Sequence, residues 1–156
     1  MAAKNYNGFT IIELMVTIAI AAILVAVAVP SMTNLYQNNQ LRNYSWELVG
    51  AIASARTEAA SRGESVTFES ITANDWQDGW QIVLDSDNSV LTQGDGLPAT
   101  SYSQALTNDD GATIYSFSID GKGRRSGDGN YALVLNDGGG HTRTFIIPLY
   151  GSPILQ

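Results

Sequence analysis

The chain has 156 residues and a net charge of −7, from 15 acidic and 8 basic side chains. This length fits one domain beside one apolar segment. The acidic balance excludes a surface that attracts nucleic acid throughout, so any such binding needs a local basic patch. The absence of cysteine excludes disulfides, cysteine-ligated zinc and a cysteine nucleophile.

The first predicted element is an apolar helix over residues 9–29, in which Glu13 is the only charged side chain. About 20 apolar residues suffice to cross a bilayer, and Lys4 on the N-terminal side favours a cytoplasmic N-terminus. A secretory signal peptide with a cleavage site at residues 26–28 and a plain one-pass anchor are the alternatives. Glu13 argues against both, because it cancels the positive charge of a signal peptide and is an unneeded cost in an anchor.

The N-terminal residues carry a family resemblance. A polar leader ending in Gly8, the sequence FTIIEL and an apolar run that ends at Pro30 resemble the start of a type IV prepilin. The resemblance implies that a prepilin peptidase cleaves between Gly8 and Phe9 and methylates the new N-terminus at Phe9. It also implies that Glu13, which is costly to leave unpaired in lipid, meets the N-terminal amine of a neighbouring subunit and so favours filament assembly.

A second helical segment is predicted over residues 31–62. Pro30 removes one backbone hydrogen bond and is expected to kink or loosen the helix, and Gly63 is the expected C-terminal stop. An apolar stripe that should dock on the following domain consists of Leu41, Leu48, Ile52, Ala55 and Ala59. The polar positions that lie mostly off this stripe are Arg42, Glu47, Ser54, Arg56, Glu58 and Arg62.

Residues 63–156 predict a β-rich globular domain. Apolar residues alternate near residues 66–68, 80–84, 115–119, 131–135 and 145–149. Turn-rich pieces separate them, among them DSDNS, TQGDGLPAT, TNDDG, DGKGRRSGDGN and NDGGG. We expect five to seven antiparallel strands packed on the helix stripe, which gives an α+β fold.

Residues 47–68 and 78–85 are similar to the minor pilins and pseudopilins of the GspH/FimT group, with the closer similarity to FimT/FimU-type minor pilins. The resemblance implies the pilin fold: a long N-terminal helix, whose first half spans the membrane, packed on two small C-terminal sheets. Many members of the group carry cysteines in the globular domain. Because this chain has none, its loops must be held in another way.

Two further motifs suggest chemistry only weakly. Residues 85–89 resemble the start of a calcium loop, but Val90 replaces the required glycine and Gly96 the closing glutamate, so a solvated hairpin turn is preferred. His141 is the only histidine and follows three glycines. No catalytic constellation accompanies it, so we expect a non-enzymatic protein without a cofactor.

Four bases raise the question of DNA binding. Lys122, Arg124 and Arg125 share one glycine-rich loop, and Arg143 is expected to lie near it across strands. Some FimT-like minor pilins are implicated in DNA capture, and such a loop can contact phosphates. We favour a solvated turn whose bases pair with Asp120, Asp128 or a neighbouring pilin, because the surrounding charge is acidic and aromatic stacking partners are not evident.

The resemblance thus predicts a minor type IV pilin that helps to start or cap a pilus. The alternatives are an H-type pseudopilin of type II secretion and a DNA-binding minor pilin for natural transformation. The implied partners are the prepilin peptidase, other pilins or pseudopilins, the inner-membrane assembly platform and membrane lipid. The protein is expected in the bacterial inner membrane as a single-pass protein with a periplasmic globular domain, and afterwards in a pilus or pseudopilus.

Overall fold

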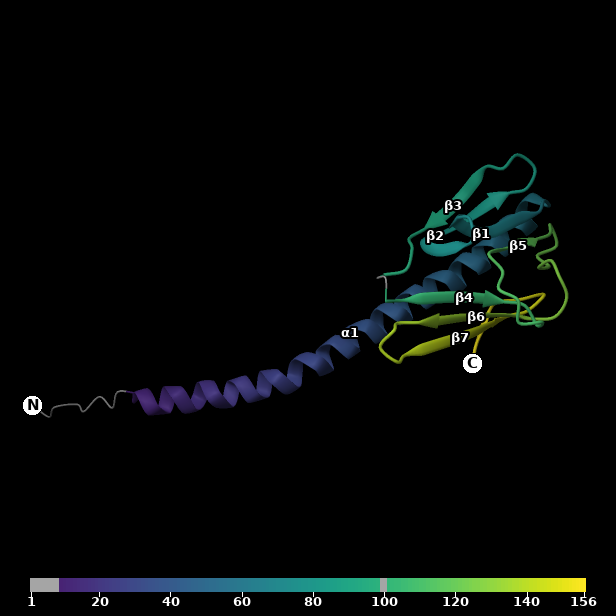
Figure 1. The fold of residues 1–156 in the computed structure, drawn as a ribbon. Coiled ribbons are helices and arrows are strands. Elements are labelled where there is room, and N and C mark those ends of the chain that lie inside the picture. The colour runs from purple at the N-terminus through teal and green to yellow at the C-terminus, as the bar shows by residue number, and fades with distance from the viewer. Residues whose placement is uncertain (1–8, 99–100) are drawn as a thin grey trace, which may run out of the picture. The chain divides into compact units, whose positions relative to one another are not determined.

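The computed structural model describes residues 9–98 and 101–156. Helix α1 (Ile11–Arg62) runs through two compact units, Met1–Tyr36 and Gln37–Gln156 (Figure 1). The predicted leader and Gly8 lie outside the described residues. The expected domain boundary after Pro30 falls within α1, six residues before the globular unit begins.

The described part of the first unit is a helix with an exposed apolar surface. Its large apolar side chains, from Phe9 to Tyr36, are all more than half exposed. By length and composition α1 is able to cross a membrane, with a mean hydropathy of 2.7 in its most apolar window. The helix continues through Pro30, and the hydroxyls of Ser31 and Thr33 donate to the carbonyls four residues earlier, at Val27 and Val29.

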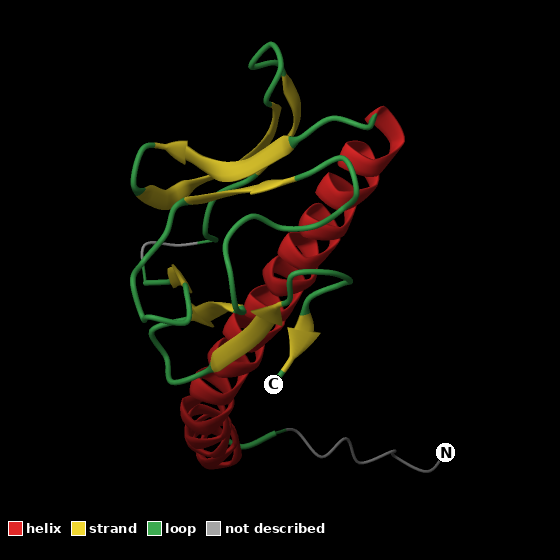
Figure 2. Cartoon of the chain, turned by 90° about the vertical axis from the view of Figure 1, so that its right-hand side faces the viewer, coloured by secondary structure: helices red, strands yellow, loops and turns green. Residues whose placement is uncertain are grey.

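The globular unit holds the rest of α1 and two four-stranded sheets. The strands are β1 (Val66–Thr72), β2 (Asp75–Leu84), β3 (Val90–Gly94), β4 (Ser103–Thr107), β5 (Ser116–Ile119), β6 (Tyr131–Asn136), β7 (Thr142–Ile147) and β8 (Ile154–Leu155). The first sheet has the order β3-β2-β1-β5 and the second β4-β6-β7-β8. All their pairings are antiparallel. The first sheet lies near the C-terminal end of α1 and the second further back along the helix (Figure 2).

The predicted stripe of α1 forms the centre of the core. Each of its five residues is at most 1% exposed: Leu41, Leu48, Ile52, Ala55 and Ala59. They pack against inward-facing strand residues, among them Phe68, Leu135 and Phe145. Gly63 ends the helix as predicted, since its φ of 67° is left-handed and its N–H reaches the carbonyl of Ala59.

The predicted exposure of one polar residue of α1 is wrong. Arg56, expected mostly off the apolar stripe, is 9% exposed. It lies one residue after Ala55 of the stripe, and its guanidinium satisfies backbone carbonyls of the second sheet's connections, as described below. A charge pattern alone does not distinguish such a position from a solvated one.

The strands differ from the prediction in number and in extent. Eight strands lie in the described residues instead of five to seven, and residues 92–94 of an expected turn belong to β3. Strand β3 pairs through its backbone with β2 while its side chains stay largely exposed, so it shows no burial alternation. Strand β8 has only two residues and β7 ends at Ile147, before Leu149, for which the expected alternation predicted a strand.

Stacked aromatic rings fill the inner face of the first sheet. Phe68 stacks on Trp76, Trp80 and Phe117 with ring centroids 5.4–5.9 Å apart, and Trp76 also stacks on Tyr115. Phe68 faces Phe117 across β1 and β5, so the strand register itself brings the rings together. Aromatic pairs add about 0.5–1.5 kcal/mol each beyond their buried area, which helps to hold a domain without disulfides.

Candidate functional site

The start of α1 is a reciprocal N-cap between Thr10 and Glu13. The Glu13 carboxylate accepts hydrogen bonds from the backbone N–H of Thr10 at 2.8 Å and from its hydroxyl at 2.9 Å. In return, the backbone N–H of Glu13 donates to the Thr10 hydroxyl oxygen at 3.2 Å. A threonine followed three residues later by a glutamate is the capping-box pattern, and this signal was overlooked in the sequence.

The cap changes the interpretation of Glu13. Its carboxylate was expected to be unpaired in a single subunit, but one oxygen, Oε2, is satisfied by Thr10. Among the described residues the other oxygen, Oε1, has no hydrogen-bond donor. Phe9 directly precedes this pair and is 75% exposed. The cap therefore leaves Oε1 able to accept a further hydrogen bond.

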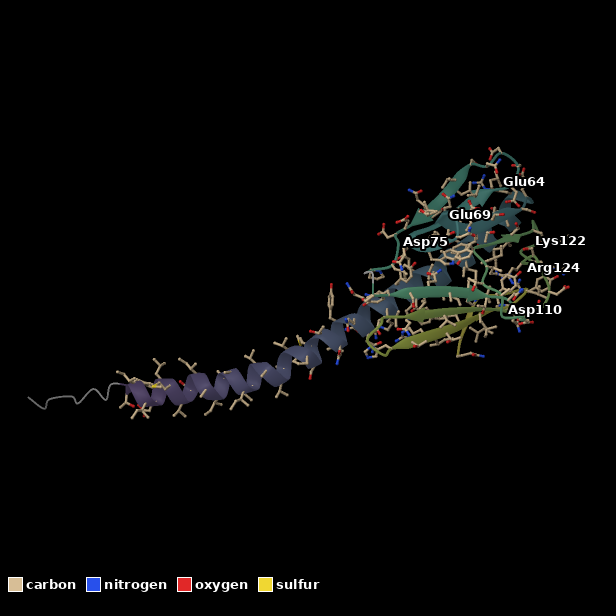
Figure 3. The ribbon with its side chains drawn as sticks, viewed as in Figure 1. Glu64, Glu69, Asp75, Asp110, Lys122 and Arg124 are labelled. Atoms are coloured by element: carbon tan, nitrogen blue, oxygen red, sulfur yellow. The ribbon has the colours of Figure 1, made fainter. Side chains whose placement is uncertain are left out.

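The glycine-rich loop that carries three of the four candidate bases is organised by Asp120. The Asp120 carboxylate accepts the backbone N–H groups of Lys122 and Arg124, both at 2.9 Å. These hydrogen bonds, first that from Arg124, hold the pKa of Asp120 below its usual value despite some desolvation. Lys122 and Arg124 are exposed at one end of the globular unit (Figure 3). Asp120 thus binds their backbone and leaves their side chains to solvent.

Arg125, a possible DNA contact or a base of a solvated turn by sequence, is in fact buried. Its side chain is fully buried, lies over the Tyr131 ring at 3.4 Å from the centroid, and donates to the carbonyls of Ser126 and Gly129 at 2.6 and 2.5 Å. Burial lowers the pKa of Arg125 from its ordinary value. Arg125 holds the loop together through these two carbonyls. Its side chain has no exposed atom that could contact a phosphate.

Arg143 does not join the other bases either. It lies at the start of β7, opposite Leu135, and that strand runs away from it towards the basic loop. The loop contacts the chain beyond β7 at Leu149, whose carbonyl accepts the N–H of Arg125. Six residues of extended chain separate the two points, about 20 Å. The expected cluster of four bases is therefore reduced to Lys122 and Arg124.

Arg56 joins the helix to the loops beyond β5 and β7. Its guanidinium donates to the carbonyls of Gly123, Pro148 and Leu149 at 2.6–3.0 Å. Desolvation, and then the nearby Arg125 charge, lower the pKa of Arg56. Buried cations are tolerated where several carbonyls solvate them. These contacts tie the helix to two loops in a chain that contains no cysteine.

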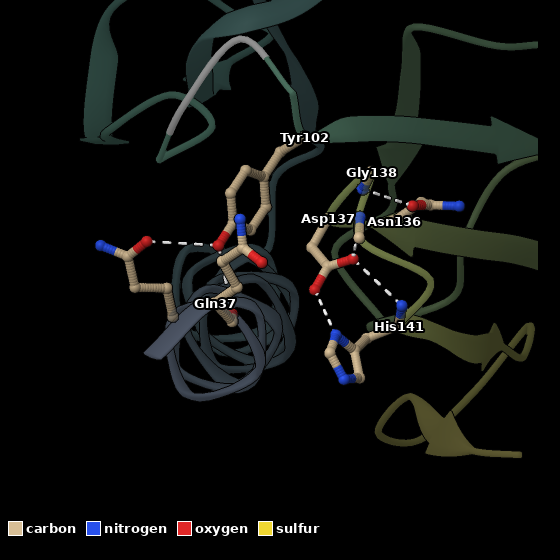
Figure 4. A network of polar contacts seen from close by, with 8 residues as sticks. Gln37, Tyr102, Asn136, Asp137, Gly138 and His141 are labelled. Atoms are coloured by element: carbon tan, nitrogen blue, oxygen red, sulfur yellow. Dashed lines mark hydrogen bonds and ion pairs between the residues drawn. The ribbon is translucent and has the colours of Figure 1, made fainter. Parts of the chain in front are cut away.

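His141 belongs to a turn built around a buried carboxylate (Figure 4). Asp137 is 1% exposed and accepts the N–H groups of Gly139 and His141, and its second oxygen lies 2.5 Å from Nδ1 of the His141 ring. Burial by itself would raise the pKa of Asp137, but the hydrogen bonds from His141 and Gly139 together lower it. The NDGGG pattern predicted the turn, but it did not predict the contact between the buried Asp137 carboxylate and the His141 ring.

The described residues contain no group of three or more histidine, aspartate or glutamate side chains placed to hold a metal ion. The suspected calcium loop forms the β2–β3 turn, where Asp87 accepts the N–H of Ser89. The buried charges Arg56, Arg125 and Asp137 hold loops and turns of the globular unit in place. The features that remain for function are the apolar helix with its Glu13 cap and the surface of the globular unit.

Two family models match the chain. One, described as type II transport protein GspH, covers residues 46–148, and the other, the prokaryotic N-terminal methylation motif, covers residues 3–29. The chain belongs to the GspH family. This GspH-family protein thus combines an N-terminal methylation motif with the globular domain of minor pilins and pseudopilins.

Solved structures agree with this assignment at the level of the fold. Two crystal structures of the type IV minor pilin FimU from Pseudomonas aeruginosa match with TM-scores of 0.64 and 0.60, at 19% and 18% sequence identity. The matches cover 76% and 74% of this chain, and 90% and 91% of the FimU chains. The long helix on two antiparallel sheets is therefore the pilin fold, as predicted.

Proposed function

We propose that this GspH-family protein is a minor type IV pilin, a structural subunit that helps to start or cap a pilus. The observation that carries the proposal is the single helix α1, which joins the methylation motif to the pilin domain. Such a subunit would be held in the inner membrane by the apolar half of α1, with its N-terminus in the cytoplasm and its globular unit in the periplasm.

Assembly would depend on the exposed end of α1. Prepilin peptidase would cleave between Gly8 and Phe9 and methylate the amine of Phe9. The free Oε1 of Glu13 then offers a partner to the amine of a neighbouring pilin, while Thr10 keeps the other oxygen bonded. In lipid such a charge pair is favourable, because an unpaired carboxylate there costs several kcal/mol. The partners are other pilins and the assembly platform of the inner membrane.

Glu13→Ala tests this proposal, with Thr10→Val as the matched control. Glu13→Ala removes both the cap and the pairing carboxylate, whereas Thr10→Val removes the hydroxyl's two cap contacts and retains the carboxylate. We expect Glu13→Ala to reduce incorporation into sheared filaments at equal membrane levels, and Thr10→Val to retain most of it. Equal incorporation of Glu13→Ala and wild type would refute the role of Glu13.

A type II secretion pseudopilin of the H kind is the second candidate, because the matching family model carries that description. The same helix and the same domain serve both machines. A deletion strain scored for surface pili and for protein secretion separates them. Loss of pili with normal secretion supports the pilin function, and loss of secretion alone assigns the protein to the secretion machine.

A further inference from the structure

The strongly exposed large apolar side chains of the globular unit gather on one side. Among its described residues, 37–98 and 101–156, six such side chains are more than a third exposed. Two are scattered on the first sheet, Ile71 in β1 and Val90 in β3. Of the other four, Tyr150 lies in the β7–β8 connection, and the remaining three form what we call the β8 patch: Trp46, Ile154 and Leu155.

The β8 patch covers the core and also presents an apolar outer surface. The Trp46 ring meets the Phe145 ring edge to face at 6.2 Å, and Leu155 lies opposite Phe145 in the β7–β8 register, on the same face. Phe145 is 1% exposed, but Trp46 is 54% and Leu155 45% exposed. Ile154 faces the other side of β8, so the apolar surface continues around this sheet edge.

Two unpaired arginines lie at one end of the patch. Helix α1 and β7 run in the same direction, since Trp46 meets Phe145 and Arg56 binds the carbonyl of Pro148 further on. Arg42 lies one turn before Trp46, about 6 Å, and Arg143 lies two residues before Phe145, about 7 Å. Both therefore come to the same end of the patch. Neither has an ion pair or a side-chain hydrogen bond within the described chain.

The Asp137 carboxylate in the β6–β7 turn is buried and bonded to Gly139 and His141, so among the described residues no carboxylate side chain pairs with these arginines. Arg143 is the only charged residue in β4, β6, β7 and β8, all of which are described throughout. Glu47 adjoins Trp46 in sequence but lines a groove with Tyr44 and Asp95, and the Tyr44 hydroxyl bonds Gln104 of β4, the opposite edge of the sheet. The complementary surface must therefore be apolar at its centre and acidic at one end.

The size of the patch restricts the kind of partner. Three partly exposed side chains offer far less apolar area than the roughly 800 Å² that each partner buries in a stable free complex. A partner that is already held nearby needs less area, because tethering raises its effective concentration. A second copy brings no carboxylate side chain among its own patch residues to meet the arginines, so a subunit with a different surface fits better.

We propose that the β8 patch docks the globular domain of a different pilin-class subunit that is held in the same membrane or filament. That subunit presents an apolar surface to Trp46 and Leu155 and a carboxylate to Arg42 and Arg143. The proposal rests on the proposed function, because the tether is the shared filament or membrane. It adds the face of contact and the chemistry of the partner.

Photo-crosslinking in the full chain, in membranes and sheared filaments of the host, tests the proposal. A photoreactive amino acid replaces Ile154, which is 61% exposed, or in a control Val90, which is 51% exposed at the edge of the first sheet. We expect position 154 to yield about ten times more of one product, equivalent to about 1.4 kcal/mol. Mass spectrometry should identify the partner in it as a second protein with a processed N-terminal methylation motif.

Charge reversal provides a second readout of the same product. Arg42→Glu and Arg143→Glu should lower the yield from position 154 severalfold, whereas Lys122→Glu, at an exposed base outside the patch, should leave it unchanged. A homodimer, adducts with lipid alone, no adduct, equal yields from both positions or equal effects of all three reversals would overturn the proposal. If wild type enters filaments in such a case, the proposed function stands; if it never does, the proposed function fails as well.

Discussion

At the scale of single residues, three buried charged side chains, Arg56, Arg125 and Asp137, bind the backbone of loops in a chain without cysteine. Arg56 and Arg125 donate to five carbonyls in all, and Asp137 accepts hydrogen bonds within one turn. Each of them bonds backbone groups of a loop. Buried backbone N–H and C=O groups need such partners, because water no longer reaches them. Their removal should therefore affect loop structure more strongly than the removal of exposed charges.

Arg125→Ala should destabilise the globular unit by about 2–4 kcal/mol, because it leaves two carbonyls unsatisfied and a cavity beside Tyr131. Arg124→Ala, on the exposed neighbour, should change the melting temperature little. Thermal melts of the two variants followed by circular dichroism make the comparison. Equal melting of both variants would mean that the carbonyls find other donors when the guanidinium is lost.

Asp137→Asn should lower stability at neutral pH by about 1–2 kcal/mol, since the carboxylate bonds to His141 and Gly139 weaken. The folded state lowers the pKa of Asp137, so its contribution is present above the unfolded pKa of about 4 and is lost as the pH falls through the folded value. Melting curves from pH 7 to pH 2 should therefore converge for variant and wild type in acid. Asp110→Asn, on an exposed loop, is the control, and a constant difference at every pH would contradict this account.

At the scale of elements, α1 has two surfaces with different tasks. Its first part exposes apolar side chains throughout, and its second part buries one stripe against both sheets. The stripe follows helical periodicity closely, which is why it was visible in the sequence. The short edge strands β3 and β8 have no such pattern, because their place depends on backbone pairing with β2 and β7.

Leu48→Asp or Ile52→Asp should prevent folding of the globular unit, because either places an unpaired charge in the helix–sheet core. A variant that starts after residue 30 should be a soluble, folded monomer. The substitutions are made in this variant, and thermal melts measure whether it still folds. Ser54→Asp, at an exposed position of the same helix, should melt like the parent. A stripe variant that melted like Ser54→Asp would show that the stripe does not dock on the sheets.

At the scale of the whole molecule, one chain combines a membrane-compatible helix with an acidic domain. The mature protein in the membrane fraction should begin at Phe9 and carry an N-methyl group, as the methylation motif implies. Intact-mass measurement and N-terminal peptide sequencing decide the point. A mature start at Val29 would instead establish the signal-peptide alternative.

DNA binding should be weak. Loss of Lys4 with the leader leaves seven bases against 15 acids, and two of the seven, Arg56 and Arg125, are buried. Two exposed bases on one loop give few phosphate contacts, each adding a salt slope of about −0.9 on duplex DNA. Gel shifts over a salt series should show little binding at physiological salt. Tight binding that Lys122→Ala with Arg124→Ala abolishes would make DNA capture the leading function.

The sequence by itself determined the elements that follow a regular pattern. The apolar run, the docking stripe, the stop at Gly63 and the alternation in β1, β2, β5, β6 and β7 are local or periodic, so each is visible without knowledge of its partners. The family and the pilin fold were implied by a resemblance in residues 8–30, 47–68 and 78–85, and the family models and the FimU fold agree with it. The Thr10–Glu13 cap was also local, and its spacing could have revealed it.

Only the tertiary structure decided which charges are buried and which surfaces are free. Arg124 and Arg125 are adjacent and chemically alike in the sequence, but the turn held by Asp120 exposes one and directs the other over Tyr131. Arg143 was predicted to lie near these two arginines. In the structure the direction of β7 places it about 20 Å along the chain from Leu149, where the basic loop makes contact. The β8 patch likewise joins Trp46 to residues more than a hundred positions later. Such contacts depend on how strands pair and where the helix packs, and neither is encoded in any short stretch of the chain.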